Sequence, residues 1–488
     1  MKQNKYRLIF FILLGLLSTF LIANKLLQKA PRPSIIEKAI AEGRFHKYEI
    51  PEGANFTPDA AHTYAPQIEG RVPVSNWHSA LFMYEGRALR IALDCFTADK
   101  LSGVRVFTII WYISWILFIL NFITIYIVTI RKRMPLYVCA SIPMAAITAP
   151  FMFPATLDCI FLTILLSSLT IIITYPAIET KFSKHLALFI LLVLLFHLVS
   201  YRKNAVLLIP IFSIVLMECL RKKILVSISE CIIVGLSGIA VIFLCSLSFS
   251  LFFPVKKMYP TLPMLESDLR IAAILRGEQA TMRRELSKIG YNTDHPLKDS
   301  LSAYYAGGKV DKEQLHKIYY REWREHTTSM LAAKLIQIAE FYTGGHLPGF
   351  IQNALRARYS ALKENDKAMN FLLSWKKPYW ITRMLILSMC FFITFRLSVK
   401  KAKGLFRSRT EEICWLAASI ATVYAVSYII VTPTADVRYL APSVVVGFPS
   451  IALYIYLWRI GANRNGKKQP HSVKTEIFRT LFPPGSPC

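Results

Sequence analysis

The chain has 488 residues, of which 54% are hydrophobic, and its mean hydropathy is +0.41. Its apolar residues gather in blocks of roughly 20, the length that a helix needs to cross a hydrocarbon layer about 30 Å thick, so the composition excludes an ordinary soluble globular domain. The formal net charge is +28, but many Lys and Arg residues stand in short loops between the apolar blocks, a pattern typical of membrane proteins and not of a nucleic-acid-binding surface.

The apolar blocks predict an all-α polytopic membrane protein with about ten transmembrane helices. In lipid every backbone amide must find its hydrogen-bond partner within its own segment, which a helix allows. The first block follows the basic stretch Met1–Arg7 and has no small-residue cleavage site after it, so we expect an uncleaved helix rather than a signal peptide. The predicted helices cover approximately residues 8–27, 105–130, 135–153, 159–176, 184–200, 205–220, 224–253, 379–397, 411–432 and 438–458.

The basic loops set the expected topology. Arg131–Arg133, Arg221–Lys223 and the loop 399–409 fall on one side if all ten helices cross, as does the basic tail after Arg459. This side is expected to be cytoplasmic, with both termini on it. Two large polar segments then lie outside. The predicted organisation is an N-terminal transmembrane module, 1–253, with the external loop 28–104; an external, mostly helical domain, 254–378; C-terminal transmembrane helices, 379–459; and a cytoplasmic tail, 460–488.

The two polar segments contain helical patterns of their own. Within Ser79–Phe96, apolar residues at helical spacing share the segment with Arg87 and Arg90, which fits an amphipathic helix that lies on the membrane surface or packs against the bundle. In the second segment we expect helices at 264–289, 311–340 and 349–374. The nine cysteines form no CxxC pair or metal-like spacing, so neither a disulfide framework nor a zinc site is predicted.

Three short external turns carry charge that the expected topology does not require. Asp158 stands in the turn between the third and fourth helices, where it caps a helix or takes part in a site. Arg202 and Lys203 follow the fifth helix, with Asn204 after them. Cations at this position oppose the charge bias of membrane proteins, so they either snorkel to the interface or bind an anion such as a phosphate.

The turn between the last two helices holds Asp436 and Arg438, followed by Tyr439. Asp436 and Arg438 either pair with each other or Arg438 joins Arg202 in holding an anion, with Tyr439 at the interface.

The first external segment is rich in polar and aromatic side chains that suit either a surface loop or a catalytic site. They are Asp59, His62, Tyr64, Gln67, Trp77 and His78.

These residues, taken in order, resemble the C-type (GT-C) superfamily of membrane glycosyltransferases, which take a sugar from a polyprenyl-phosphate carrier. Asp59, Tyr64, Gln67 and Trp77-His78 match an external-loop pattern, with Ser79 where the family has Pro. Four further elements resemble family motifs: Leu157-Asp158 without the family's preceding Lys, Arg202–Ala205 as R-x-N-A, Asp268-Leu269, and Asp436–Pro442 as D-x-R-Y-L-x-P. The size and topology are also similar to serotype-converting O-antigen glucosyltransferases.

The resemblance implies an inverting transfer of sugar from undecaprenyl phosphate to a cell-envelope glycan such as lipopolysaccharide O-antigen. The site would face the periplasm at the bacterial inner membrane. No metal cofactor is expected, because such enzymes do not generally need one. It implies Asp59 as the base; substrate contacts from Tyr64, Gln67, Trp77, His78 and Asp158; and phosphate contacts from Arg202, Lys203, Asn204, Arg438 and Tyr439.

A transporter or flippase for an anionic lipid-linked substrate is the alternative hypothesis. It would use the same cations to bind the headgroup without a carboxylate base. Such proteins carry ionisable residues near the middle of the bilayer, in which the predicted helices are poor.

Overall fold

The structure is a computed structural model. It describes residues 2–45, 50–57, 59–75, 79–97, 99–152, 157–221, 228–255, 262–290, 310–343, 379–406, 408–431 and 440–465. Within these ranges the protein is all-helical, with no β-strand. The predicted all-α class is therefore confirmed.

Each of the ten predicted apolar blocks coincides with helical structure. The corresponding helices are α1 (Lys2–Gln28), α5 (Gly103–Arg131), α6 (Leu136–Met152), α7 (Leu157–Thr174), α8 (Lys181–Tyr201), α9 (Ile209–Arg221), α10 (Ile228–Phe252), α18 (Tyr379–Ala402), α19 (Arg409–Val431) and α20 (Ala441–Asn465). Two short 3₁₀ helices adjoin them, η2 (Tyr175–Ala177) after α7 and η3 (Lys203–Leu208) before α9.

Seven helical stretches among the described residues are long and apolar enough to cross a membrane, which indicates a multi-pass membrane protein. A shorter apolar stretch, Leu136–Ala149, lies in α6. Because α18 and α19 are not among the seven, ten crossings remain a prediction. The seven stretches are Ile9–Ala41, Gly103–Arg131, Leu157–Ala177, Lys181–Tyr201, Lys203–Arg221, Ser229–Phe249 and Ala441–Gly461.

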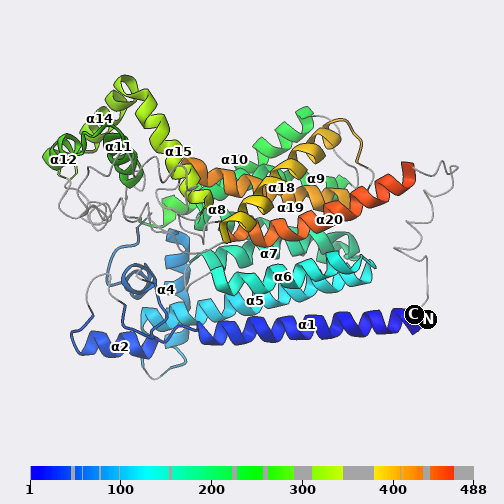
Figure 1. Ribbon diagram of the computed structural model, residues 1–488. Helices are drawn as coiled ribbons and strands as arrows, with labels where there is room; N and C mark the ends of the chain where they lie inside the picture. The colour runs from blue at the N-terminus through cyan, green and yellow to red at the C-terminus, as the bar shows by residue number, and fades with distance from the viewer. Residues whose placement is uncertain are drawn as a thin grey trace.

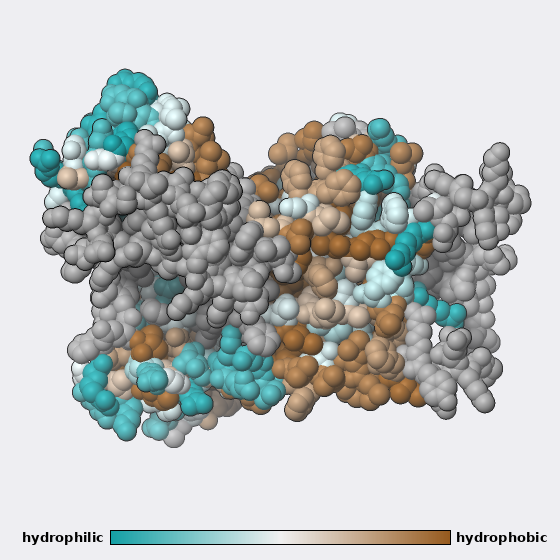
Figure 2. All heavy atoms as spheres, viewed as in Figure 1, coloured by the Kyte–Doolittle hydropathy of each residue, from teal (hydrophilic) through white to brown (hydrophobic). Residues whose placement is uncertain are grey.

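The long helices run side by side in one bundle, and successive helices alternate in direction (Figure 1). We call the end of the bundle that carries the two polar segments the domain end. We call the opposite end, where the loops at 131–135 and 403–406 lie, the basic end. Figure 2 shows brown, apolar surface along the bundle and teal, polar surface gathered over the helices at the domain end.

Aromatic side chains and a few hydroxyl groups hold the bundle together. Helix α5 packs against α7, and α20 packs against α6, α18 and α19. The Tyr126 hydroxyl donates to the Phe11 carbonyl oxygen at 2.9 Å, which joins α5 to α1, and Thr163 on α7 donates to the Ser114 carbonyl oxygen at 3.0 Å. Phe161 on α7 stacks on Tyr424 of α19 with ring centroids 5.0 Å apart. The two hydrogen bonds give the hydroxyl groups partners that lipid cannot supply.

The first polar segment forms four short helices at the domain end. They are α2 (Pro33–Ala41), the π-helix η1 (Asp59–Tyr64), α3 (Ala65–Glu69) and α4 (Ala80–Asp94).

The segment Ser79–Phe96 is expected to form a helix either on the membrane surface or packed against the bundle. Helix α4, which covers most of this segment, packs against α3, α5 and α8, as the second interpretation requires. Arg87 donates to the carbonyl oxygens of Gln67 and Val72 at 2.6 and 2.9 Å. Arg90 likewise donates to backbone carbonyl oxygens, so both cations fasten the segment to itself.

The second polar segment is divided more finely than the sequence predicted. The helix expected at 264–289 is two helices, α11 (Leu262–Arg276) and α12 (Gln279–Lys288). Gly277 separates them with a φ of +77°, a left-handed conformation that ends a helix. The helix expected at 311–340 is also two, α14 (Lys312–Glu325) and α15 (Thr327–Thr343). The helix predicted at 349–374 lies outside the described residues.

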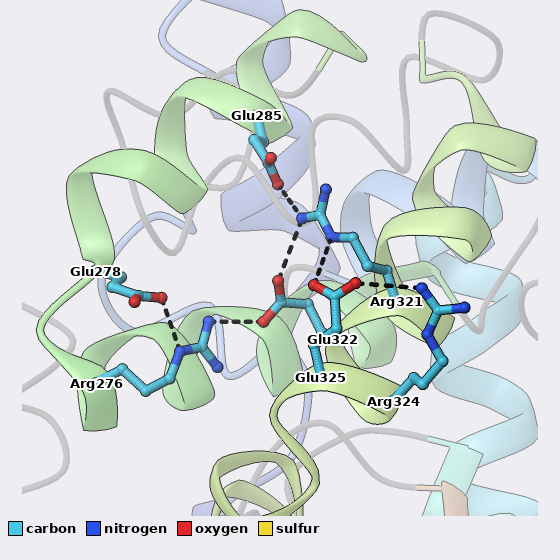
Figure 3. A network of polar contacts seen from close by, with 7 residues as sticks. All are labelled: Arg276, Glu278, Glu285, Arg321, Glu322, Arg324 and Glu325. Carbon is cyan, nitrogen blue, oxygen red and sulfur yellow. Dashed lines mark hydrogen bonds and ion pairs between the residues drawn. The ribbon is translucent and has the colours of Figure 1, made fainter.

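A network of ion pairs holds the helices of this segment together (Figure 3). Arg276 on α11 contacts Glu278 at 2.8 Å and Glu322 at 2.6 Å. Arg321 on α14 contacts Glu285 on α12 at 2.6 Å and its neighbour Glu322 at 3.2 Å. The hydrogen bond from Arg276 lowers the pKa of Glu278, and the bond to Glu285 raises the pKa of Arg321. The two shifts favour the charged carboxylate of Glu278 and the charged guanidinium of Arg321.

Gly103 lies so close to the backbone of α3 that we expect substitution by a larger residue to destabilise the protein. Gly103 begins α5 directly against α3, where its N–H donates to Glu69 Oε1 at 2.5 Å. An added Cβ at Gly103 would lie 2.8 Å from the Ala65 Cα atom, and backbone there cannot give way easily. We expect Gly103→Ala to lower the free energy of unfolding by about 1–3 kcal/mol, the usual cost of overpacking.

The matched control is Gly461→Ala on α20, where an added Cβ meets nothing within 4 Å. This change should leave stability unchanged or raise it by up to about 1 kcal/mol, because alanine favours helix. Thermal unfolding in detergent checks both variants, and equal behaviour of the two would contradict the packing account.

Candidate functional site

The candidate site is built where α8 ends at the domain end. Helix α8 stops at the buried Tyr201, and Arg202 takes an extended backbone conformation with φ −140° and ψ 106°. Helix η3 then begins and buries Ala205 and Leu208, while Lys203 stays exposed. Because the backbone turns at Arg202, the cation is placed at the rim of the bundle and not inside it.

Arg202 forms an ion pair with Asp158, which lies in the first turn of α7. The Asp158 side chain is 2% exposed and that of Arg202 is 21% exposed. A carboxylate in the first turn is also favoured by the helix dipole. The two residues are 44 positions apart in the chain, so sequence spacing does not reveal this partner.

Asn204 ties the same turn to α19, because its side-chain amide donates to Ser427 Oγ at 2.8 Å. Helix η3 packs against both α8 and α19. The R-x-N-A element therefore connects three helices at the domain end.

Glu85 on α4 is a polar residue of this region that the sequence analysis missed. Its carboxylate accepts a hydrogen bond from the Tyr201 hydroxyl at 2.5 Å, and its other oxygen lies 2.6 Å from His197 Nε2. His197 Nδ1 lies 2.6 Å from the Val193 carbonyl oxygen, so both ring nitrogens face acceptors, which fits the doubly protonated imidazolium. The available signal was an acidic residue at helical spacing from the apolar Phe82 and Leu89.

An aromatic series links the first polar segment to this turn. Tyr64, which is 2% exposed, contacts Phe82 of α4 with ring centroids 6.0 Å apart. Phe82 contacts Tyr201 at 5.7 Å. Tyr64 and Tyr201, the neighbour of Arg202, are thus brought to the same end of the bundle, although they are far apart in the sequence.

Gln67 lies in the core of the first segment. Its side-chain oxygen accepts from the Ser75 backbone N–H at 2.9 Å, and its carbonyl oxygen accepts from Arg87. Gln67 therefore fixes the position of the loop at Ser75.

Asp59 begins η1, which packs against α3 and α5. Helix α4 packs against both α3, which follows the Asp59 segment, and α8, which precedes Arg202.

Several predicted residues cannot be placed in this arrangement. Trp77, His78, Asp436, Arg438 and Tyr439 lie outside the described residues. The proposed joint role of Arg202 and Arg438 stays a prediction.

The Asp268-Leu269 pair has a structural position on α11. Both residues are completely buried, and the Asp268 carboxylate accepts from Lys334 Nζ at 2.7 Å and from the Tyr319 hydroxyl at 2.9 Å. Burial raises the pKa of Tyr319 to about 12, and the neighbouring Asp268 charge acts in the same direction. The carboxylate joins α11, α14 and α15, which explains an aspartate here without a substrate.

The part of the chain that the structure describes contains no group of three or more His, Cys, Asp or Glu residues arranged to hold a metal ion. The chemistry available at the domain end is a guanidinium oriented by a buried carboxylate, with a second carboxylate, Glu85, and an imidazole next to it.

Comparisons of the chain with protein-family models, with curated proteins and with solved structures found no match.

The contacts of Glu85 predict that the stable packing of α4 depends on the negative charge of this side chain. Glu85→Gln keeps the shape of the side chain but weakens the hydrogen bonds from Tyr201 and His197, which we expect to cost about 1–2 kcal/mol. Hydrogen exchange of the backbone amides of α4 should become faster.

Glu42→Gln serves as the matched control, because Glu42 pairs with Arg44 and Lys38 at the protein surface. Exposed pairs of this kind contribute little. If α4 exchanges as slowly in Glu85→Gln as in Glu42→Gln, the anchoring role of Glu85 is wrong.

Proposed function

We propose that this protein is an inverting membrane glycosyltransferase of the GT-C type. It moves a sugar from a polyprenyl-phosphate carrier, undecaprenyl phosphate in bacteria, to a cell-envelope glycan such as lipopolysaccharide O-antigen. The reaction takes place at the domain end, which faces the periplasm. All ten helices cross the inner membrane, and both termini are cytoplasmic.

The observation that carries the proposal is the Arg202–Asp158 pair at the rim of the bundle. A cation on this side is not needed for topology, because the basic loops lie at the other end. A guanidinium has five N–H donors in a fixed plane, and one of them goes to Asp158. The buried carboxylate holds that plane in one orientation, and a guanidinium oriented in advance at the rim of the bundle suits recognition of a phosphate.

The reaction needs a base and a stabilised leaving group. An acceptor hydroxyl oxygen attacks the anomeric carbon from the face opposite the phosphate, and the bond between that carbon and the phosphate oxygen breaks. The bonding electrons leave with the polyprenyl phosphate, whose growing negative charge Arg202 and Lys203 stabilise. Asp59 accepts the proton of the acceptor hydroxyl as the new glycosidic bond forms.

The remaining predicted residues have supporting roles. Tyr64, Gln67, Trp77 and His78 shape the sugar and acceptor subsites. Asn204 holds the phosphate-binding turn through its bond to Ser427.

A transporter or flippase stays the rival hypothesis. It would bind the same lipid phosphate but would have no use for a carboxylate base. The positions of two ion pairs support the enzyme: Asp158–Arg202 lies at the domain end and the buried Glu218–Lys401 pair lies at the basic end, so neither occupies the middle of the bilayer.

The proposal predicts separate effects for the base and the phosphate ligand. Purified protein is supplied with polyprenyl-phosphate-linked sugar and a lipopolysaccharide acceptor, and glycan transfer is measured together with donor binding. Asp59→Asn should lower the transfer rate about 10²–10⁴-fold, the usual contribution of a general base, with donor binding retained. Arg202→Ala should lower the transfer rate and, unlike Asp59→Asn, should also weaken donor binding.

Asp99→Asn and Arg324→Ala are the matched controls, because both side chains are exposed at the protein surface. They should transfer sugar at the wild-type rate. Full activity of Asp59→Asn would exclude Asp59 as the base. Wild-type protein that binds the lipid-linked sugar but transfers none of it would favour the transporter.

A further inference from the structure

A partly open cavity of about 140 Å³ lies between helices of the bundle toward the basic end, away from the candidate site. Its walls come from α5, α6, α7, α19 and α20. Most of the lining is apolar, with Phe118 and Phe122 from α5, Ile142 from α6 and Leu169 from α7.

The shape and position of the cavity limit what can fill it. An apolar cavity of roughly 150 Å³ can hold a benzene-sized hydrocarbon, so this cavity has room for a short stretch of one acyl chain. Three of the helices that line it, α5, α7 and α20, carry membrane-spanning stretches, so the surrounding solvent is lipid. Water gains little from an apolar cavity of this kind. A slender hydrocarbon chain from the adjacent leaflet is the occupant that matches these walls.

The rim of the cavity at the basic end is cationic. Lys132, directly after α5, lines the cavity together with the hydroxyl-bearing residues Thr129 and Thr410. Burial lowers the pKa of the Lys132 ammonium, and the positive charge of Arg409 lowers it further. Arg409 is itself paired with Glu412, whereas Lys132 lines the cavity, so an anion bound at the rim would stabilise the charged ammonium of Lys132.

Apolar walls and a cationic rim together match one class of molecule. We propose that the cavity binds one acyl chain of an anionic phospholipid from the leaflet at the basic end, with the phosphate of that lipid at Lys132. Basic pockets between transmembrane helices on the cytoplasmic side bind anionic headgroups for the same electrostatic reason. Because the cavity joins five helices, a bound chain would stabilise their packing. This site is independent of the proposed transfer reaction, which lies at the other end.

The test compares two lipids that differ in headgroup charge alone. Full-length protein in neutral detergent is titrated with phosphatidylglycerol or with phosphatidylcholine of the same acyl chains, and bound lipid is counted by native mass spectrometry. Wild type should bind phosphatidylglycerol more tightly. Lys132→Gln should weaken its affinity about fivefold, the effect of one cation near the surface, and Lys132→Arg should restore it.

Lys181→Gln is the matched control, because Lys181 is an exposed cation at the same end and does not line the cavity. Its affinity for phosphatidylglycerol should equal that of wild type. A second variant, Ala146→Leu, places extra carbon atoms in the cavity wall and should reduce binding of both lipids.

Equal affinity of wild type for the two lipids would overturn the proposal. So would an equal loss in Lys132→Gln and Lys181→Gln, because binding would then follow the total charge of the basic end and not the rim of the cavity. If the folded Ala146→Leu variant binds both lipids as tightly as wild type does, the acyl chain does not occupy the cavity.

Discussion

Lipid restricts where this chain can carry charge. A hydrocarbon layer cannot solvate an ion, so charged side chains of the bundle gather near its ends and take partners there. At the domain end the partners are Arg202 and the buried Asp158, and at the basic end they are Lys401 and the buried Glu218. Each pair joins helices that are distant in sequence. The two ends of the bundle therefore contain both the ion pairs that join its helices and the charged side chains that could bind a ligand.

The sequence predicted the helices well because one physical quantity, the length of an apolar block, determines them. It predicted the finer divisions less well. The break at Gly277 depends on a left-handed backbone conformation within an otherwise helical pattern. The pairing of Asp158 with Arg202 joins positions on different helices, and the approach of Glu85 to Tyr201 depends on how α4 packs. Contacts of this kind follow from tertiary packing, which periodicity does not encode.

The two ends differ in what their charges have to do. At the basic end, Lys and Arg residues are expected from topology alone, and Lys132 acquires a more specific interpretation because it lines an apolar cavity. At the domain end, topology gives no reason for Arg202. Three features favour an anion site there. Arg202 pairs with the buried Asp158, Asn204 is bonded to Ser427, and Glu85 accepts a hydrogen bond from the adjacent Tyr201. The proposed enzyme uses this site to bind a lipid phosphate.

The most direct measurement compares binding of a polyprenyl phosphate with binding of the uncharged polyprenol of the same length. Affinities are determined for wild type and for Arg202→Gln, both verified as folded by thermal unfolding. The account predicts that wild type prefers the phosphate by tenfold or more and that Arg202→Gln loses this preference, because a charge-assisted bidentate contact is worth about 1.5–3 kcal/mol. A phosphate preference that survives in Arg202→Gln would contradict the central claim.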